Sequence, residues 1–153
     1  MGRSLRKNKQ EVPQCAATAC QIMTVHFIPS EIVPIIHADL IRRYGGSLGM
    51  RDAGLLDSAL AQPRMTFDGR YMHKTLFNKA VAYGFHLCKN HPFVDGNKRV
   101  AFVIMDMFLQ KNGWEINSSE EDAYIMMIEL AGSKLSKPQL SKWLRDHCIR
   151  LER

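Results

Sequence analysis

Two stretches in the middle of the chain are hydrophobic on nearly every side of a helical projection. One covers residues 75–89 and the other covers residues 97–111. A helix that is apolar around most of its circumference is normally buried, so both stretches predict central helices of the core. The apolar positions are Leu76, Phe77, Ala80, Val81, Tyr83, Gly84, Leu87 and Cys88 in the first stretch, and Val100, Phe102, Val103, Met105, Met107, Phe108 and Leu109 in the second.

Shorter amphipathic segments precede this pair. The pattern predicts a first helix over residues 30–44, with Ser30 as its N-cap and two glycines after its end. His37 falls inside this helix, and we interpret it as a structural side chain. A second short helix is predicted over residues 52–61, where a proline soon follows. Residues 64–73 break the helical pattern and are expected to form a connecting loop.

Two further helices are predicted after the central pair. Ser118 and Glu121 match a capping box at the start of a helix that ends near residue 131. A last helix is expected to begin at Ser136, with Leu140 and Trp143 on its inner face. No segment has the alternation of a half-buried strand. The prediction is therefore an all-α bundle of about six helices, with the segment between the two central helices on a stiff mounting.

Length and composition limit the possible classes of protein. The 153 residues suit a single domain over residues 23–153, preceded by residues 1–22, whose polar, aperiodic sequence predicts a disordered extension. No apolar run of about 18 residues is present, and no hydrophobic region of a signal peptide follows the basic N-terminus. We therefore expect a cytoplasmic protein without a membrane anchor. The net charge is +6, and residues 1–22, with four cations and one acid, account for +3 of it. The remaining +3 does not predict nucleic-acid binding.

The segment between the central helices concentrates the chemistry of the chain. Residues 91–99 read His-Pro-Phe-Val-Asp-Gly-Asn-Lys-Arg. Asn97 suits a helix N-cap, and Gly96 suits a twist that turns backbone N–H groups toward one point. Those N–H groups, the helix dipole and the charges of Lys98 and Arg99 together favour an anion such as phosphate.

Two other residues of the segment suggest what could be done to that anion. Asp95 would weaken anion binding unless it held a divalent ion that bridges to phosphate oxygens. His91 is the only group of the segment whose ordinary pKa lies near neutrality, so it is the natural acceptor for the proton of a substrate hydroxyl. Taken singly each residue is more often structural, whereas together at this spacing they favour a functional site.

The same residues resemble the active-site motif of the Fic/Doc superfamily, whose adenylyltransferase branch reads approximately H-P-F-x-[D/E]-G-N-G-R. Lys98 stands at the position of the second glycine of that branch, and the Asn-Lys-Arg ending is similar to the Doc (death-on-curing) toxins. Residues 51–63 and 27–37 resemble two further segments of Doc proteins. The resemblance extends over residues 23–143 and implies the helical Fic/Doc fold.

The resemblance implies a Doc-type kinase that transfers phosphate from ATP, with Mg²⁺, to a Ser or Thr hydroxyl of a protein. In the family the target is elongation factor Tu, whose modification arrests translation. His91 would be the general base, Asp95 would hold Mg²⁺ and Phe93 would anchor the loop in the core. Nucleotide phosphates would be bound by Gly96, Asn97, Lys98 and Arg99.

Two alternatives stay open. The same loop could transfer AMP if ATP were bound in the opposite direction. Lys98 favours the kinase, because its side chain is expected to fill the space that the second glycine leaves free in adenylyltransferases. A non-enzymatic module that binds RNA or DNA would need aromatic residues interleaved with Lys and Arg, whereas the aromatics here lie mainly at core-like positions.

The resemblance also implies two partner-binding features. Thr66, Phe67, Asp68 and Gly69 fall in the region of the flap that positions the target polypeptide in Fic/Doc proteins. The chain lacks the [S/T]-x-x-x-E-[G/N] string of self-inhibited Fic proteins, so inhibition by a separate Phd-like antitoxin is expected. A helical C-terminal segment of that antitoxin would cover the motif or the neighbouring groove.

Overall fold

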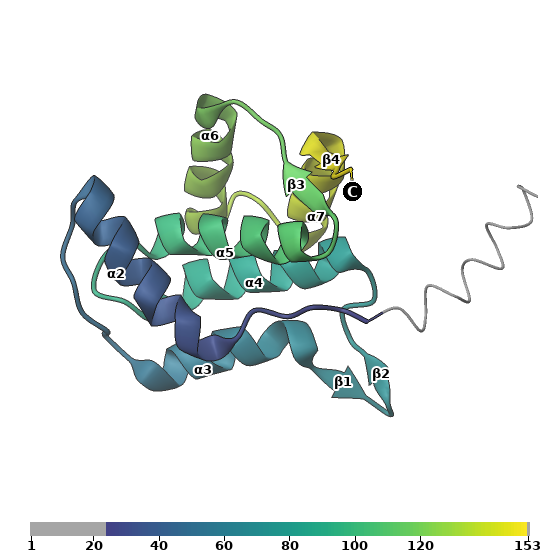
Figure 1. Cartoon of the computed structure of the whole chain (residues 1–153), viewed down its shortest axis with the longest axis horizontal. Coiled ribbons are helices and arrows are strands. Elements are labelled where there is room, and N and C mark those ends of the chain that lie inside the picture. Colours follow the sequence, from purple (N-terminus) through teal and green to yellow (C-terminus); the bar gives the residue numbers. More distant parts are fainter. Residues whose placement is uncertain (1–23, 153) are drawn as a thin grey trace, which may run out of the picture.

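The computed structural model describes residues 24–152, which form six α-helices around one core (Figure 1). The predicted all-α bundle is confirmed, with two short pairs of strands in addition. In chain order, with the labels of Figure 1, the elements are η1 (Ser30–Ile32), α2 (Val33–Tyr44), α3 (Ala53–Ala61), η2 (Gln62–Arg64), β1 (Thr66–Phe67), β2 (Arg70–Tyr71), α4 (Leu76–Asn90), α5 (Asn97–Lys111), β3 (Trp114–Ile116), α6 (Glu120–Ala131), α7 (Lys137–His147) and β4 (Cys148–Arg150).

Helices α4 and α5 are the central pair, as the hydrophobic pattern predicts. They lie side by side in the middle of the molecule, and α2, α3, α6 and α7 surround them (Figure 1). Both are lined by side chains with almost no exposed surface, among them Tyr83, Leu87, Ile104, Met105 and Phe108. The loop between them is therefore fixed at both ends to the most rigid part of the fold.

Two predicted helix starts are wrong. Ser30 does not cap the first helix, because residues 30–32 form a turn of 3₁₀ helix from which α2 continues without a side-chain cap. The predicted capping box of Ser118 and Glu121 does not form either. Ser119 caps α6 instead, with its hydroxyl accepting a hydrogen bond from the backbone N–H of Asp122. Before α6 two serines stand side by side, and the path of the chain places the second of them at the cap.

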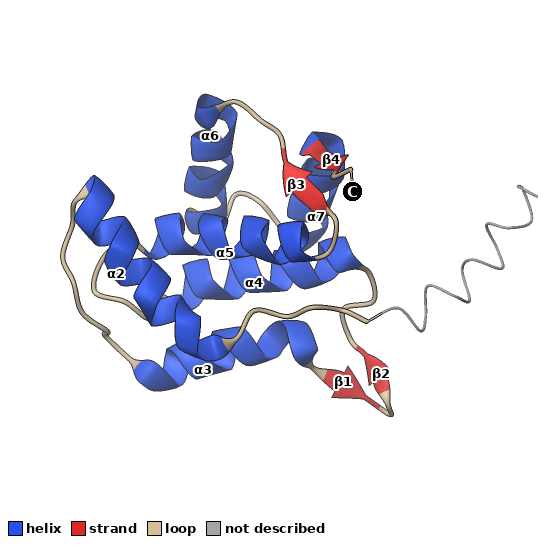
Figure 2. Cartoon of the chain, viewed as in Figure 1, coloured by secondary structure: helices blue, strands red, loops and turns tan. Residues whose placement is uncertain are grey.

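The fold also contains two short pairs of strands, β1 with β2 and β3 with β4 (Figure 2), which the hydrophobic pattern does not predict. Residues 66–71, expected to be loop, form a two-stranded hairpin in which Thr66 pairs with Tyr71. Asp68 and Gly69 occupy its turn with φ values of 57° and 77°, and Asp-Gly is a preferred pair for such a tight turn. The second pair joins β3 antiparallel to β4 at the end of the chain. Strands of two or three residues are too short for a recognisable alternation.

Within residues 24–152 no helix is long and apolar enough to cross a membrane. The predicted disordered extension, residues 1–22, lies outside the described residues. Cys88 and Cys148 are free thiols, and burial raises the pKa of each above its ordinary value, to about 12 for Cys148.

Candidate active site between helices α4 and α5

The loop that joins α4 to α5 turns sharply at both ends. His91, which follows the last residue of α4, has a φ of 55°, and Gly96, which precedes α5, has a φ of 78°. Glycine adopts this left-handed conformation freely, whereas histidine adopts it rarely. A strained backbone of this kind persists only where surrounding contacts hold it. Three groups of contacts do so here.

Asn97 holds the loop from within the first turn of α5. Its Oδ1 accepts a hydrogen bond from the N–H of Phe93, and its Nδ2 donates to the carbonyl of the same residue, both at 2.9 Å. The prediction that Asn97 is the N-cap is therefore wrong: Gly96 takes that position, and no side chain caps α5. Because the amide is used to satisfy two buried backbone groups, the first N–H groups of α5 are left to face an anion.

The same amide determines which nitrogen of His91 carries a proton. Asn97 Nδ2 lies 3.0 Å from His91 Nδ1. Since the two bonds to Phe93 fix the orientation of the amide, Nδ2 is the donor and Nδ1 the acceptor. A neutral His91 in this arrangement carries its proton on Nε2. Nε2 can therefore accept a proton from a hydroxyl only after the exposed ring changes its tautomer, which gives up the hydrogen bond from Asn97.

Residues 49–52 form the second group of contacts, antiparallel to the loop. The backbone N–H of Arg51 donates to the carbonyl of Pro92 at 2.7 Å. The guanidinium of Arg51 donates from Nε to the carbonyl of His91 at 2.8 Å and from Nη2 to the carbonyl of Asn90 at 3.0 Å. A cation at the C-terminal end of a helix is favoured by the helix dipole. Arg51 thus holds α4 and the strained residue His91 together.

His37 of α2 is the third. Its ring is stacked on the buried ring of Phe93, with centroids 3.8 Å apart and an interplanar angle of 7°. Its Nε2 lies 2.7 Å from the carbonyl of Asp95, which can only accept, so Nε2 is the donor. His37 is 3% exposed and Phe93 1%. The interpretation of His37 as structural is thus refined, since what it supports is the loop itself.

Asp95 presents an ionised carboxylate at the surface of the loop. Its Oδ2 accepts from the N–H of Ser47 at 3.1 Å, and its Oδ1 accepts from the N–H of Gly96 at 2.8 Å. These two bonds lower the pKa of the carboxyl, and the charges of Lys98 and Arg99 add to the effect. At Gly46 an added Cβ would lie 2.8 Å from Oδ2, so only glycine allows this approach.

Asp95 fits the way in which Mg²⁺ is commonly held. No group of three or more His, Cys, Asp or Glu side chains able to hold a metal ion occurs among the described residues. Mg²⁺, however, is usually bound through one or two carboxylates together with substrate phosphates and water, rather than by a cage of protein ligands. An ionised carboxylate beside an anion site therefore suits this ion.

The loop opens onto a cavity of about 770 Å³ between α5 and α6. The charged end of the cavity includes His91, Asp95 and the start of α5, and its other end is apolar, with Phe102, Tyr124 and Ile128 on the walls. Volumes of this size are typical of ligand pockets. One ligand could therefore place a charged group at the loop and an apolar group between the helices.

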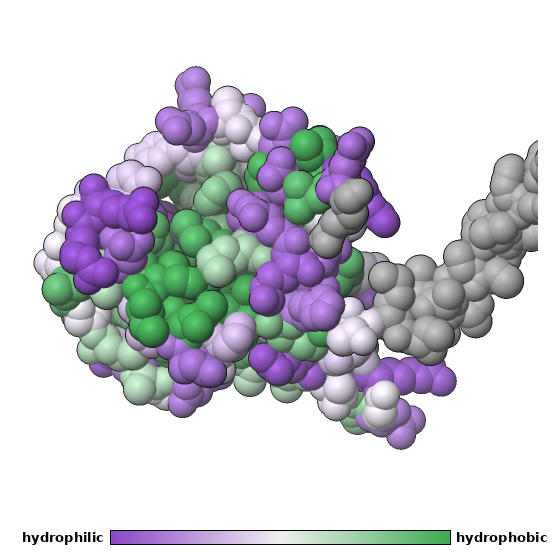
Figure 3. Space-filling view, viewed as in Figure 1, coloured by the Kyte–Doolittle hydropathy of each residue, from purple (hydrophilic) through white to green (hydrophobic). Residues whose placement is uncertain are grey.

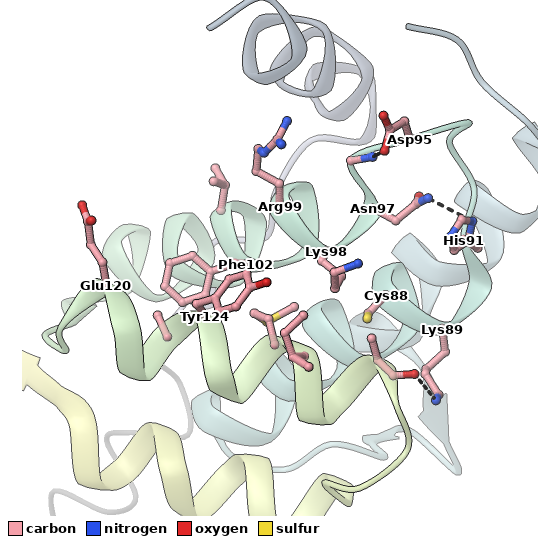
Figure 4. A pocket seen from close by; sticks show the side chains of 16 residues that line it. Cys88, Lys89, His91, Asp95, Asn97, Lys98, Arg99, Phe102, Glu120 and Tyr124 are labelled. Atoms are coloured by element: carbon pink, nitrogen blue, oxygen red, sulfur yellow. Dashed lines mark hydrogen bonds between the residues drawn. The ribbon is translucent and has the colours of Figure 1, made fainter. Parts of the chain in front are cut away.

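The two cations of the motif point in different directions (Figure 4). Lys98 extends into the cavity toward Cys88, whereas Arg99 extends toward α2, where its Nη1 donates to the carbonyl of Gly45 at 3.0 Å. Both line the cavity. The ammonium of Lys98 could therefore contact a phosphate in the cavity directly. Arg99 would first have to release the carbonyl of Gly45.

The structure does not bring the predicted flap to this site. The hairpin with Thr66, Phe67, Asp68 and Gly69 leads into the first turn of α4, whereas His91 follows the last turn (Figure 1). With 15 residues, α4 is about 22 Å long. A target polypeptide would have to span that length to touch both.

Fold, loop geometry and cavity together define a helical protein whose motif loop brings an imidazole, a carboxylate and the uncapped start of a helix to one cavity. The sequence profile of the Fic/DOC family matches residues 27–109. The chain therefore belongs to the Fic/Doc family, and its relatives place it with the Doc proteins.

Two relatives define the similarity further. The chain is 44% identical over 73 residues to "Toxin Doc" of Mycolicibacterium smegmatis, an alignment that covers 48% of this chain and 56% of that protein. It is 32% identical over 98 residues to "Protein kinase doc" of Escherichia phage P1, which covers 63% of this chain and 75% of that protein. The chain thus spans just over half the length of the first relative and three quarters of the second.

Proposed function

We propose that this protein is the toxin of a type II toxin–antitoxin module, acting in the cytoplasm as a protein kinase. It transfers the γ-phosphate of ATP to a Ser or Thr hydroxyl of a target protein, which we expect to be elongation factor Tu. The observation that carries the proposal is the convergence of His91, Asp95 and the uncapped start of α5 on one cavity. Phosphoryl transfer depends mainly on positioning and charge neutralisation, and this arrangement supplies both.

Each group of the loop has a distinct part in the proposed reaction. The first N–H groups of α5 and the ammonium of Lys98 bind the phosphates of the nucleotide. After release from Asn97, His91 uses its Nε2 to accept the proton of the attacking hydroxyl. Asp95 would hold Mg²⁺, which neutralises developing negative charge on the phosphate oxygens.

Transfer of AMP through the same loop is the second candidate, and Lys98 distinguishes the two. The test uses ATP labelled at either the α- or the γ-phosphate, with purified elongation factor Tu as acceptor and the Lys98→Gly variant in parallel. We expect label from the γ-phosphate alone with the natural chain, and a loss of that transfer in the variant. Label from the α-phosphate with the natural chain would overturn the kinase proposal.

A Phd-like antitoxin is the proposed inhibitor of the toxin. Hydrophobic side chains gather on the face over α2 and α5 (Figure 3), and the apolar walls of the cavity continue from the motif loop along α5 and α6. Tyr124 and Ile128 are exposed there, which suits an amphipathic helix laid into the groove. Size-exclusion chromatography of the co-expressed pair should give a complex that Tyr124→Glu weakens, and a pair that elutes separately would contradict the proposal.

A further inference from the structure

A second cavity lies at the other end of α4. Its volume is about 350 Å³, and it shares no lining residue with the cavity at the motif loop. Its walls come from the first half of α4, from one side of α7 along most of its length and from the segment that leads into α4. The lining residues are His73, Asn78, Val81, Lys137, Pro138, Ser141 and Arg145.

The charge in this cavity is positive and uncompensated. Lys137 and Arg145 are permanently charged, and no lining residue is acidic. The sequence of α4 contains no Asp or Glu. The one acid of α7, Asp146, is paired with Lys142 at 2.8 Å. Neither Lys137 nor Arg145 forms an ion pair with the described residues.

The buried ammonium of Lys79 adds to the positive electrostatic potential near this cavity. Lys79 is 2% exposed, and its Nζ donates to the carbonyl of His73 at 2.7 Å and lies 4.2 Å from the ring centroid of Tyr71. Burial and nearby positive charge act together on two imidazoles close to the cavity. Burial, then the charges of Lys137 and Lys79, lower the pKa of His73. For His86 burial, Lys137 and His73 lower the pKa to about 4.

Neutral groups in the cavity are already fixed in position. The hydroxyl of Ser141, which is 4% exposed, donates to Asn78 Oδ1 at 3.2 Å. The hydroxyl oxygen of Ser141 also accepts a hydrogen bond from Nη1 of Arg145 at 2.8 Å. This chain of bonds holds the guanidinium at the cavity wall, and its remaining N–H groups are available to a ligand. A preorganised Arg and a Lys that line the same cavity can bind an oxyanion between them.

We infer that the cavity between α4 and α7 is a second, non-catalytic site that binds a phosphate monoester through Arg145, Lys137 and His73. The forked guanidinium and the ammonium match a tetrahedral dianion, and His73 can take up a proton when the negative charge arrives. The phosphate can belong to a free small molecule or to a phosphorylated side chain of a protein. Either source would place a recognition step at the end of the molecule remote from the motif loop.

The test follows backbone amide shifts of the full chain by NMR during titration with inorganic phosphate, with chloride at equal ionic strength as reference. We expect saturable shifts around Lys137, Ser141 and Arg145, separate from any at residues 96–99. Arg145→Gln and Lys137→Gln should each weaken this binding about tenfold. The matched control is Lys134→Gln, which removes an exposed cation that does not line the cavity and should leave the affinity unchanged.

Well-dispersed spectra of the variants establish that they remain folded. The inference is overturned if phosphate shifts only residues 96–99, if the shifts around α7 do not saturate, or if Lys134→Gln weakens binding as much as Arg145→Gln. A phosphoserine peptide then identifies the source of the phosphate. Tighter binding of the peptide than of inorganic phosphate assigns a protein ligand, and equal affinities assign a small molecule. Neither Gln variant should alter phosphate transfer at the motif loop.

Discussion

Cations line a cavity at each end of α4, yet the two ends are built differently. At the C-terminal end the cations Lys98 and Arg99 stand beside Asp95, and an imidazole lies next to them. At the N-terminal end Lys137 and Arg145 have an imidazole but no carboxylate among the lining residues. Positive charge alone is enough to bind phosphate, whereas transfer of phosphate needs a way to hold a metal ion and to move a proton. In our proposals the carboxylate therefore separates a transfer site from a binding site.

The ends also differ in how firmly their loops are held. The motif loop is stacked on His37, bonded to Arg51 and tied by Asn97. The hairpin at the opposite end exposes 76% of Phe67. Groups that must act together on a reacting atom need fixed positions. A variant at one end of α4 can therefore be compared with a matched variant elsewhere in the fold.

The largest effect should come from His91→Ala. The variant loses the proton acceptor and should transfer phosphate about 10²–10⁴-fold more slowly, the usual range for a general base. His73→Ala is the matched control, because it removes an imidazole from the other end of α4. Initial rates of transfer check the prediction, and a comparable loss in both variants would remove the distinction between the ends.

Phe93→Ala should destabilise the whole domain. The ring is fully buried and stacked on His37, and removing a buried Phe side chain costs about 3–5 kcal/mol. Phe67→Ala provides the comparison, because that ring is exposed, and should change the free energy of unfolding by less than about 0.5 kcal/mol. Urea denaturation measures both. Similar losses would mean that the hairpin packs as firmly as the loop.

His37→Phe should separate support of the loop from support of the fold. The new ring keeps the stacking on Phe93 but cannot donate to the carbonyl of Asp95, so we expect transfer to fall about tenfold, with a higher Mg²⁺ requirement. His147→Phe is a matched control, because His147 is also stacked, on Trp143, and bonds to a backbone carbonyl. The measurement is the initial rate of phosphate transfer by each variant over a range of Mg²⁺ concentrations. An unchanged Mg²⁺ requirement in the first variant would contradict the role given to His37.

The smallest effect concerns pH and the cationic end. Burial, with the charges of Lys137 and His73, lowers the pKa of His86 to about 4 from 6.5. The unfolded chain then binds a proton that the folded chain does not, so stability should fall as pH decreases from about 6.5 to 4. Given its partial exposure, we expect at most about 2 kcal/mol. Thermal unfolding of His86→Leu should show a weaker dependence in that range, and an unchanged dependence would contradict this assignment.

The central helix pair and the motif loop between them could be predicted from the sequence, because each is a continuous segment of the chain. The catalytic roles of the loop residues stay predictions. The sequence could not predict how the loop is held. His37 and Arg51 lie 39 residues or more from the backbone carbonyls that their side chains contact, and a lone His or Arg carries no local signal of such a contact. The N-cap prediction for Asn97 was wrong for a related reason. Asn at a helix start usually caps the helix, but here its side chain bonds to the backbone N–H and carbonyl of Phe93.

The most direct test of the central claim is the intact mass of elongation factor Tu after incubation with ATP, Mg²⁺ and the purified protein. The account predicts a gain of one phosphate with the natural chain and no gain with His91→Ala. A gain of one AMP, or a gain of phosphate that persists in His91→Ala, would contradict it.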